Sequence, residues 1–326
     1  MMSNFYSYLI SKNHGKEISL LSSFESDKFI KRKTCEMMLE DLSDEYKKFQ
    51  YREKELERDA INFWIGKNES IQPVIDTIEF KKAKRLIKKY KKVLILAGAG
   101  MSQDSDVPVF RTNGSNILVN HDFSNAKELQ KLFSDKKPHS GYKELLKYFN
   151  DNKDIEYYVE TTNIDNFFIR AGFDKERVAE IHGNIFRYQC IKKCNNKIYL
   201  YNDKSDMKCD ICNTFLRPNV MLFNDYDFID TTYYIENNIK KWIENANGEI
   251  LIIELGVGIH IPTLRDYSEI LIDRYKSSSL IRVNKEHYKI SDDLWSDLSE
   301  TDKGTRLSKI PFSCSFFLET VYINNE

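Results

Sequence analysis

The sequence predicts an α/β fold built on a mostly parallel sheet, and three observations support this. Four short, largely apolar runs have the length and composition of strands that are buried on both faces: residues 94–97, 155–160, 250–253 and 280–283. Segments with helical spacing, such as residues 142–149, separate these runs. Each run ends in a polar or glycine-rich turn. Because ligands of open α/β sheets bind beyond the carboxyl ends of the strands, these turns predict one shared pocket.

The composition is that of a globular protein with balanced charge. The chain has 326 residues, of which 41% are hydrophobic, so it can form one large domain or two modest ones with a buried core. Its 49 basic and 50 acidic side chains give a net charge of −1, so we expect neither nucleic acid nor a membrane surface as a partner. The sequence shows no membrane span and no signal peptide, which predicts a cytoplasmic location.

Two charged segments precede the first predicted strand. Residues 1–80 predict a charged helical extension, because Lys and Glu are dense there and apolar residues recur at mixed helical spacing. We interpret it as a solvated structural face; the alternative is an arm that binds a partner. The lysine-rich run at 81–92 is compatible with nucleic-acid binding. However, the run also contains four residues that share one helical face, which favours an amphipathic helix leading into the first strand: Ala83, Leu86, Ile87 and Tyr90.

Four of the six cysteines form two close pairs, Cys190 with Cys194 and Cys209 with Cys212. In a chain without a signal peptide, two such pairs separated by a loop predict a tetrahedral thiolate site for Zn2+ rather than disulfides. No further ligand is apparent, so we expect a structural zinc rather than a catalytic one. The alternative is a set of reduced, unpaired thiols. We expect Cys35 and Cys314 to be buried thiols.

The run VLILAGAGMSQDSDVPVFR, residues 93–111, joins the first predicted strand to a Gly-Ala-Gly turn. A glycine-rich turn after a buried strand is where α/β sheets bind phosphate groups. The spacing fits neither the G-x-G-x-x-G fingerprint nor a P-loop, because the third glycine and the Gly-Lys-Ser/Thr are missing. From these residues alone, either a different ligand binds here or none does.

One histidine lies between the predicted pocket and the cysteines. His182 precedes Gly183 in the run EIHGNIFRYQC. A histidine titrates near neutral pH and can take a proton from a hydroxyl group. A lone histidine is more often structural, so both interpretations of His182 are open on this observation alone. We interpret His139 and His260 as structural.

In this order the motifs resemble those of the sirtuins, the Sir2-type NAD-dependent protein deacylases, over roughly residues 85–290. The run from residue 98 resembles the family's Gly-Ala-Gly-x-Ser-x-x-Ser-Gly-Ile-Pro-Asp-Phe-Arg. TTNID at 161–165 resembles Thr-Gln-Asn-Ile-Asp, and EIHG at 180–183 resembles the catalytic Glu-Leu-His-Gly. LRPNVMLFND at 216–225 resembles the strand that pairs with substrate peptide, and the cysteines fit the family's zinc ribbon.

The resemblance implies a Rossmann-like NAD-binding fold with an inserted zinc-ribbon lobe. Residues 81–186 and 217–326 would form the NAD-binding domain, with a helical cap at about 112–150. Residues 187–216 would form the zinc-ribbon domain, and residues 1–80 the helical extension.

The resemblance also implies site residues. The co-substrate NAD+ would bind to Gly98, Ala99, Gly100, Ser102, Phe110, Arg111, Thr162, Asn163, Asp165, Gly256, Val257, Gly258 and Asn284. Asn163 and Asp165 would form the nicotinamide and ribose pocket and, with the general base His182, the catalytic set. An acylated-lysine protein or peptide would pair with Val220, Met221 and Phe223. Zn2+ would bind to Cys190, Cys194, Cys209 and Cys212.

In the reaction of that family, the acyl-lysine carbonyl oxygen attacks the ribose C1′ as nicotinamide leaves. The histidine then helps a ribose hydroxyl attack the resulting imidate. The products are the free lysine, nicotinamide and O-acyl-ADP-ribose, so NAD+ is consumed and no hydride moves.

Several positions depart from the family pattern: Asp106 for Gly, Val109 for Asp, Thr162 for Gln, Val257-Gly258 for Thr-Ser, and Asn224-Asp225 for Gly-Glu. Four runs resemble a divergent microbial branch: TTN at 161–163, ELGVG at 254–258, IRVNKE at 281–286 and PHSGYKELL at 138–146. Some members of that branch ADP-ribosylate proteins, and those transferases lack the catalytic histidine. This chain keeps His182, so we expect a deacylase. The alternatives are a protein ADP-ribosyltransferase, an NAD hydrolase of cell defence, and an NAD-binding module without activity.

Overall fold

The computed structural model describes residues 78–107, 126–200, 207–222 and 224–323. The chain divides into two compact units, residues 1–71 and 72–326, and all described residues belong to the second unit. The predictions for the amino-terminal extension before residue 78 and for Cys35 therefore lie outside the described residues.

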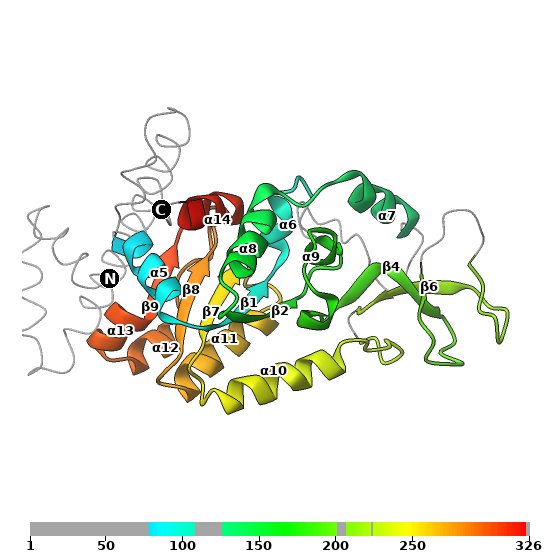
Figure 1. Ribbon diagram of the computed structural model, residues 1–326. Coiled ribbons are helices and arrows are strands. Elements are labelled where there is room, and N and C mark those ends of the chain that lie inside the picture. The colour runs from blue at the N-terminus through cyan, green and yellow to red at the C-terminus, as the bar shows by residue number, and fades with distance from the viewer. Residues whose placement is uncertain (1–77, 108–125, 201–206, 223, 324–326) are drawn as a thin grey trace, which may run out of the picture. The chain divides into compact units, whose positions relative to one another are not determined.

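Six parallel strands form the main sheet, in the order β3-β2-β1-β7-β8-β9 (Figure 1). Their bounds are β1 Lys92–Ala97, β2 Glu156–Thr161, β3 Val178–Glu180, β7 Leu251–Leu255, β8 Ser279–Val283 and β9 Leu307–Ile310. The four predicted strands are β1, β2, β7 and β8, with ends that differ by one or two residues. The strands β3 and β9 were not predicted, because β3 has only three residues and β9 contains Ser308 and Lys309, so neither forms a continuous apolar run. The α/β class with a parallel sheet is confirmed.

The central strands read as continuous apolar runs because helices cover both faces of the sheet. Leu94, Leu96 and Ile252 are 0% exposed, and each contributes about 1.5–3 kcal/mol by burial, as an upper estimate. Leu94 lies opposite Ile252 on the neighbouring strand, so these apolar residues pack in rows across the sheet.

Two helical layers cover the sheet (Figure 1). On one side, α8 Ser140–Asp151 and α14 Cys314–Ile323 pack together beside α5 Ile78–Lys89; on the other lie α10 Tyr233–Asn245 and α11 Thr263–Arg274. The helix predicted at 142–149 is α8. The other described helices are α6 Ala99–Gln103, α7 Ala126–Asp135, α9 Phe167–Arg170, a 3-10 helix Lys175–Arg177, α12 Asp292–Asp297 and α13 Glu300–Arg306. Among the described residues, no helix is long and apolar enough to span a lipid bilayer.

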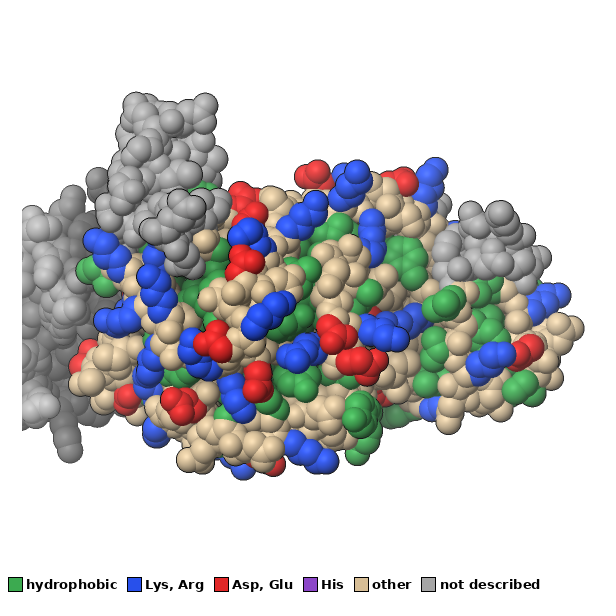
Figure 2. Space-filling view, in the orientation of Figure 1, with side chains coloured by type: hydrophobic (Ala, Val, Ile, Leu, Met, Phe, Trp, Pro, Cys, Tyr) green, Lys and Arg blue, Asp and Glu red, His purple; other side chains and the backbone are tan. Residues whose placement is uncertain are grey.

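The lysine-rich run forms most of α5, and its amphipathic character is confirmed. The buried side chains of α5 include Ala83, Leu86 and Ile87, and Tyr90 after the helix is also buried. The helix ends at Lys89 rather than Lys92, because β1 begins at Lys92. On the face in Figure 2, Lys and Arg side chains are interspersed with Asp and Glu.

A second sheet of three antiparallel strands extends from the main domain, in the order β5-β4-β6. Its strands are β4 Gly183–Cys190, β5 Tyr199–Leu200 and β6 Leu216–Val220. Figure 1 shows β4 and β6 extending away from the main sheet. The strand β4 begins directly after His182 and ends at Cys190, and the other three clustered cysteines lie between β4 and β6. The sheet begins four residues before the predicted lobe at 187–216 and ends four residues after it.

Candidate active site

The strand order of the main sheet reverses between β1 and β7. The chain runs from β1 to β2 and β3 on one side, then returns to β7, β8 and β9 on the other. Open α/β sheets bind ligands at this switch point, beyond the carboxyl ends of the strands. The turns after β1, β2, β3, β7 and β8 contain the predicted site residues, and the parallel strands bring these turns to one edge of the sheet.

Two of these turns meet backbone to backbone. Gly98 N donates to Leu255 O at 3.0 Å, and Gly100 N donates to Gly256 O at 3.0 Å. A Cβ on Gly98 or Gly100 would lie 2.8 Å from backbone atoms of the 256–257 turn, and Gly256 itself has φ +64°. Only glycine fits such a close approach. The contact between the two turns therefore requires these glycines whether or not a phosphate binds beside them.

Ser102, Asn163 and Asp165 form a buried polar cluster at the ends of β1 and β2; each is at most 7% exposed. Asn163 Nδ2 donates to Gly98 O at 2.9 Å and to Ser102 Oγ at 2.8 Å, and the Ser102 hydroxyl donates to Asp165. Asp165 also accepts a hydrogen bond from Phe167 N at 2.8 Å. Burial raises the pKa of the Asp165 carboxyl, while the bonds from Ser102 and Phe167 oppose that shift. The cluster is thus fixed in place before any ligand arrives.

His182 lies at the passage from the main sheet to the small sheet. Its neighbour Ile181 donates its backbone N–H to Thr161 O at 3.0 Å, and Met221 N donates to His182 O at 2.9 Å. Burial lowers the pKa of the His182 imidazole. The ring is therefore neutral at pH 7, and one of its nitrogens can accept a proton.

A buried carboxylate that the sequence analysis did not single out lies two residues before His182. Glu180 is 3% exposed; both of its oxygens accept from Asn184 Nδ2 at 2.9 Å, and Arg187 lies 3.0 Å away. Burial raises the pKa of Glu180 to about 7, although Arg187 and Asn184 favour the ionised form. These contacts tie β3 to β4 across His182. Glu180 and Arg187 lie on two different strands, β3 and β4, so their contact depends on the turn at His182 and is not visible as a strand pattern in the sequence.

The predicted peptide-pairing segment follows β6. Val220 is 3% exposed, Met221 is 42% exposed, and Phe223 lies outside the described residues. A bidentate ion pair holds the segment: Arg217 Nη1 and Nη2 lie 2.7 and 2.9 Å from the two carboxylate oxygens of Asp225. Both side chains are buried, and the bidentate geometry fixes the orientation of one side chain relative to the other. Asp225 replaces the family's Glu at this position, and it still supplies a carboxylate to Arg217.

Two further departures from family glycines lie on left-handed backbone, Asp106 with φ 57° and Asn224 with φ 58°. After glycine, Asp and Asn tolerate this conformation best. We expect Asn224→Gly to leave the free energy of unfolding unchanged or slightly higher, and Asn224→Ala to lower it by about 1 kcal/mol. Chemical denaturation measures both variants.

The matched control for Asn224 is Asn150, which is exposed in the last turn of α8. There the order reverses, because alanine favours a helix and glycine disfavours it by about 1 kcal/mol. If Asn224→Gly proves less stable than Asn224→Ala, the left-handed backbone at this position is not what selects Asn.

The turns after β7 and β8 are joined by one side chain. Asn284 Nδ2 donates to Val257 O at 2.9 Å, and Asn284 Oδ1 accepts from Glu286 N and His287 N at 3.0 and 2.9 Å. The Val257 side chain is 3% exposed and packs in the apolar core, so it is directed away from the sheet edge. A Cβ added to Gly258 would meet open space.

Some predicted residues are not tested by these contacts. Phe110 and Arg111, with the altered Val109, lie outside the described residues. Of the predicted helical cap at about 112–150, residues 126–150 are described, and they contain α7 and nearly all of α8. The structural interpretation of His139 is confirmed, because its ring nitrogen Nδ1 accepts from Gly141 N at 3.1 Å and caps α8. Thr162 is partly buried at the end of β2.

The structure brings all four predicted zinc ligands together. The sulfur atoms of Cys190, Cys194, Cys209 and Cys212 lie within 4.8 Å of one another. The distances of the Cys194 sulfur to those of Cys209 and Cys212 are 3.4 and 3.3 Å. A tetrahedral Zn2+ with Zn–S bonds of about 2.3 Å needs sulfur atoms somewhat under about 4 Å apart, so the cluster fits this ion. Asn195 Nδ2 lies 3.1 Å from the Cys194 sulfur and supplies a hydrogen bond to it.

The fold and the site define a doubly wound α/β protein with a buried polar cluster at the switch point and a lobe that can hold zinc. The model of the Sir2 family matches residues 118–241. Together with the curated relatives and the shared fold, this match supports the assignment of the chain to this family, the sirtuins.

Curated relatives agree with this assignment. The chain is 32% identical over 168 residues to "NAD-dependent protein deacetylase 2" of Caldanaerobacter subterraneus, covering 45% of this chain and 66% of that protein. It is 27% identical over 227 residues to "NAD-dependent protein deacetylase" of Clostridium tetani, covering 63% and 86%. A "NAD-dependent protein deacylase" of Leptospira interrogans is 27% identical over 168 residues, covering 45% and 67%.

Solved structures share the fold. One described as "The Structural basis of Sirtuin Substrate Affinity" superposes with a TM-score of 0.55 at 24% identity, covering 76% of this chain and 100% of that one. Another, described as "Sir2-p53 peptide-NAD+", has a TM-score of 0.52 at 25% identity and covers 74% and 96%.

Proposed function

We propose that this sirtuin is an NAD-dependent protein-lysine deacylase. The observation that carries the proposal is the position of His182, a neutral imidazole between the buried polar cluster and the segment after β6. The relative from Clostridium tetani is named an NAD-dependent protein deacetylase, and the match covers 86% of its length, which supports the same activity.

In this proposal NAD+ binds along the carboxyl edge of the sheet and supplies an electrophilic ribose carbon from which nicotinamide departs. The side-chain oxygens of Asn163 and Asp165 offer acceptors for the carboxamide N–H groups of nicotinamide, and the cluster around Ser102 holds both side chains in place. The backbone of the turn at Gly98, Ala99 and Gly100 faces the diphosphate. The adenosine half lies at the turns of Gly256, Val257, Gly258 and Asn284, with Thr162, Phe110 and Arg111 as further contacts.

The acylated-lysine peptide adds to the segment of Val220, Met221 and Phe223 by backbone hydrogen bonds. The buried pair of Arg217 and Asp225 fixes the two ends of this segment. Met221 N is already bonded to His182 O, so a peptide on this segment lies directly beside the histidine.

His182 acts as the general base. Its neutral ring accepts the proton of a ribose hydroxyl, which makes that oxygen a nucleophile toward the acyl carbon. Glu180, Asn184 and Arg187 hold the strands on either side of His182 and so orient its backbone. The four-cysteine cluster holds Zn2+ in a closed structural site that stabilises the small sheet.

The alternatives are a protein ADP-ribosyltransferase and an NAD hydrolase. The retained His182 favours deacylation over ADP-ribosylation. The exposed Met221 beside it favours a peptide substrate over plain hydrolysis, which needs no peptide-pairing edge. The cytoplasmic location and the absence of a nucleic-acid or membrane partner stay predictions.

Mass spectrometry of the products tests the proposal after incubation with NAD+ and a panel of acyl-lysine peptides. We expect O-acyl-ADP-ribose together with the free-lysine peptide, and the peptide that reacts names the acyl group. ADP-ribose attached to a protein would instead establish a transferase.

A further inference from the structure

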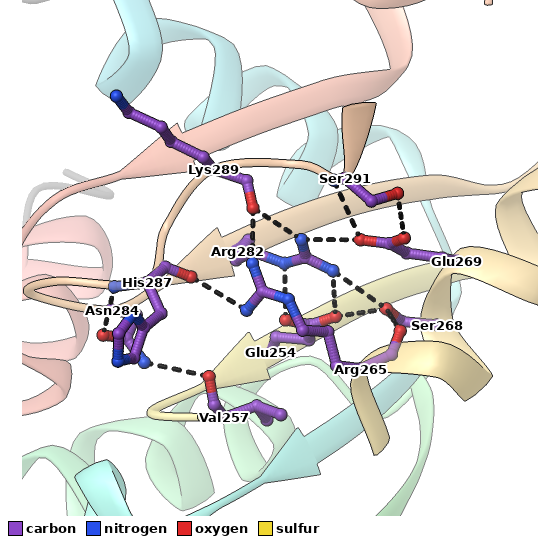
Figure 3. A network of polar contacts seen from close by, with 10 residues as sticks. All are labelled: Glu254, Val257, Arg265, Ser268, Glu269, Arg282, Asn284, His287, Lys289 and Ser291. Carbon is purple, nitrogen blue, oxygen red and sulfur yellow. Dashed lines mark hydrogen bonds and ion pairs between the residues drawn. The ribbon is translucent and has the colours of Figure 1, made fainter. Parts of the chain in front are cut away.

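A buried charge network between β7, β8 and α11 has no role in the proposed reaction (Figure 3). At its centre Arg282 is 0% exposed and Glu254 is 1% exposed, and the two residues lie opposite each other on adjacent strands. Arg282 Nε and Nη2 donate to the two oxygens of Glu254 at 2.6 and 2.8 Å. The pair is therefore bidentate and shielded from water.

The guanidinium of Arg282 has acceptors on every side. Nη1 donates to Glu269 Oε1 and to Lys289 O, both at 2.8 Å, and Nη2 also reaches Ser268 Oγ at 3.4 Å. Arg265 supplies a second positive charge, so the two arginines balance the two glutamates. Well-packed apolar residues often replace a buried ion pair without loss of stability. Stability alone therefore does not explain why charges occupy these strand positions.

The network holds the loop after β8 against α11 at three points. Arg265 Nη1 donates to His287 O at 2.9 Å. Lys289 O accepts from both Arg265 and Arg282. Glu269 accepts from Ser291, from the backbone N–H at 3.3 Å and from the hydroxyl. The backbone from residue 287 to residue 291 is thus fixed by side chains of α11 and β8 (Figure 3).

The same loop begins with Asn284, which joins it to the turn after β7. Asn284 bonds to Val257 O and to the amides of Glu286 and His287. Because His287 is held both by Asn284 and by Arg265, a displacement of the loop also displaces Asn284 and the turn at residues 256–258.

We infer that the ion pair of Arg282 and Glu254 positions the two turns that bind the adenosine half of NAD+, residues 256–258 and 284–287. This inference rests on the proposed function, which places NAD+ at those turns. Both side chains are too deeply buried to touch a ligand at the sheet edge, so they are positioning residues. Loss of the pair weakens NAD+ binding and leaves peptide binding and the step at His182 unchanged.

The test uses Arg282→Met, Glu269→Gln and the double variant Glu254→Leu with Arg282→Met, which leaves no lone buried charge. Calorimetry measures the Kd for NAD+ and for ADP-ribose, and steady-state kinetics measure kcat and both KM values. We expect the Kd and the KM for NAD+ to rise about tenfold in Arg282→Met and in the double variant, and less in Glu269→Gln. The kcat at saturating NAD+ and the KM for peptide stay unchanged.

Arg306→Met is the matched control. Arg306 is also a buried arginine that holds backbone carbonyls, those of Ser278 at 2.9 Å and Ile272 at 2.7 Å. Ser278 directly precedes β8, and Ile272 lies in the last turn of α11. Both carbonyls are therefore at the end of β8 that is opposite to the proposed NAD+ turns. We expect this variant to lose stability without a change in the Kd for NAD+.

The outcomes separate the inference from the proposed function. If the double variant folds and binds NAD+ as tightly as the wild type, the inference is overturned and the proposed function stands. If the wild type does not bind NAD+ at all, both are overturned. If neither Arg282→Met nor the double variant folds, Glu269→Gln decides the question. An unchanged Kd for NAD+ in Glu269→Gln counts against the inference.

Discussion

We expect His182→Ala to lower the kcat of deacylation by about a thousandfold, because it removes the general base. The Kd for NAD+ should stay close to that of the wild type, since the buried cluster of Ser102, Asn163 and Asp165 is intact. Steady-state kinetics with an acyl-lysine peptide and calorimetry with NAD+ measure the two effects.

The control for His182 is His139→Asn. The ring of His139 caps α8, and asparagine is a good cap at the same position, so this variant keeps its fold and its activity. Undiminished turnover in His182→Ala would show that His182 is not the base.

The same histidine sets the pH dependence. Burial holds the pKa of His182 below the ordinary 6.5, and the neutral ring is the active form. Activity should therefore be constant near pH 7 and fall only as the pH drops through that lowered pKa. The stability contribution of the buried neutral ring has the same sign: it is present above pH 6.5 and is lost as the pH falls.

The pH profile of kcat/KM measures this, and Glu180→Gln removes the other nearby group, whose pKa is about 7. If the wild type and Glu180→Gln both lose activity with an apparent pKa above 7, the neutral-base assignment fails.

The second large effect is expected at the cysteine cluster. We expect Cys209→Ser to abolish zinc binding and to unfold the small sheet, because β5 is two residues long and three short strands need a further source of stability. Elemental analysis should find one zinc per chain in the wild type and much less in the variant, and the melting curve should shift to lower temperature.

Cys314→Ala is the control for that experiment, since Cys314 is a buried thiol of α14 that lies outside the cluster. It should keep its zinc. A Cys209→Ser protein with full zinc content and an unchanged melting curve would contradict the structural role of the metal.

The parts of the fold that the sequence predicts are those that carry a local signal. The strands β1, β2, β7 and β8 read as apolar runs because they are buried on both faces. The three-residue β3 and the four-residue β9 carry no such signal, and their places in the sheet depend on pairing with distant strands. The zinc ligands were found because cysteine spacing is itself the signal.

The parts that could not be predicted depend on register. Glu254 and Arg282 are 28 residues apart, and only the alignment of β7 with β8 makes them a pair. Each of these apolar strands contains one charged residue, which is visible in the sequence, but the sequence does not show which residue it pairs with. In the sequence, Gly98 and Gly100 predict a phosphate-binding turn. The structure shows a second reason for these glycines, because a side chain at either position would collide with the backbone of the turn at Gly256.

The release of nicotinamide, measured with and without an acyl-lysine peptide, tests the central claim most directly. If the protein is a deacylase, NAD+ is consumed only when peptide is present, and one nicotinamide appears for each lysine that is freed. If nicotinamide appears at the same rate without peptide, the pocket hydrolyses NAD+, and the assignment of His182 and the segment after β6 to deacylation is wrong.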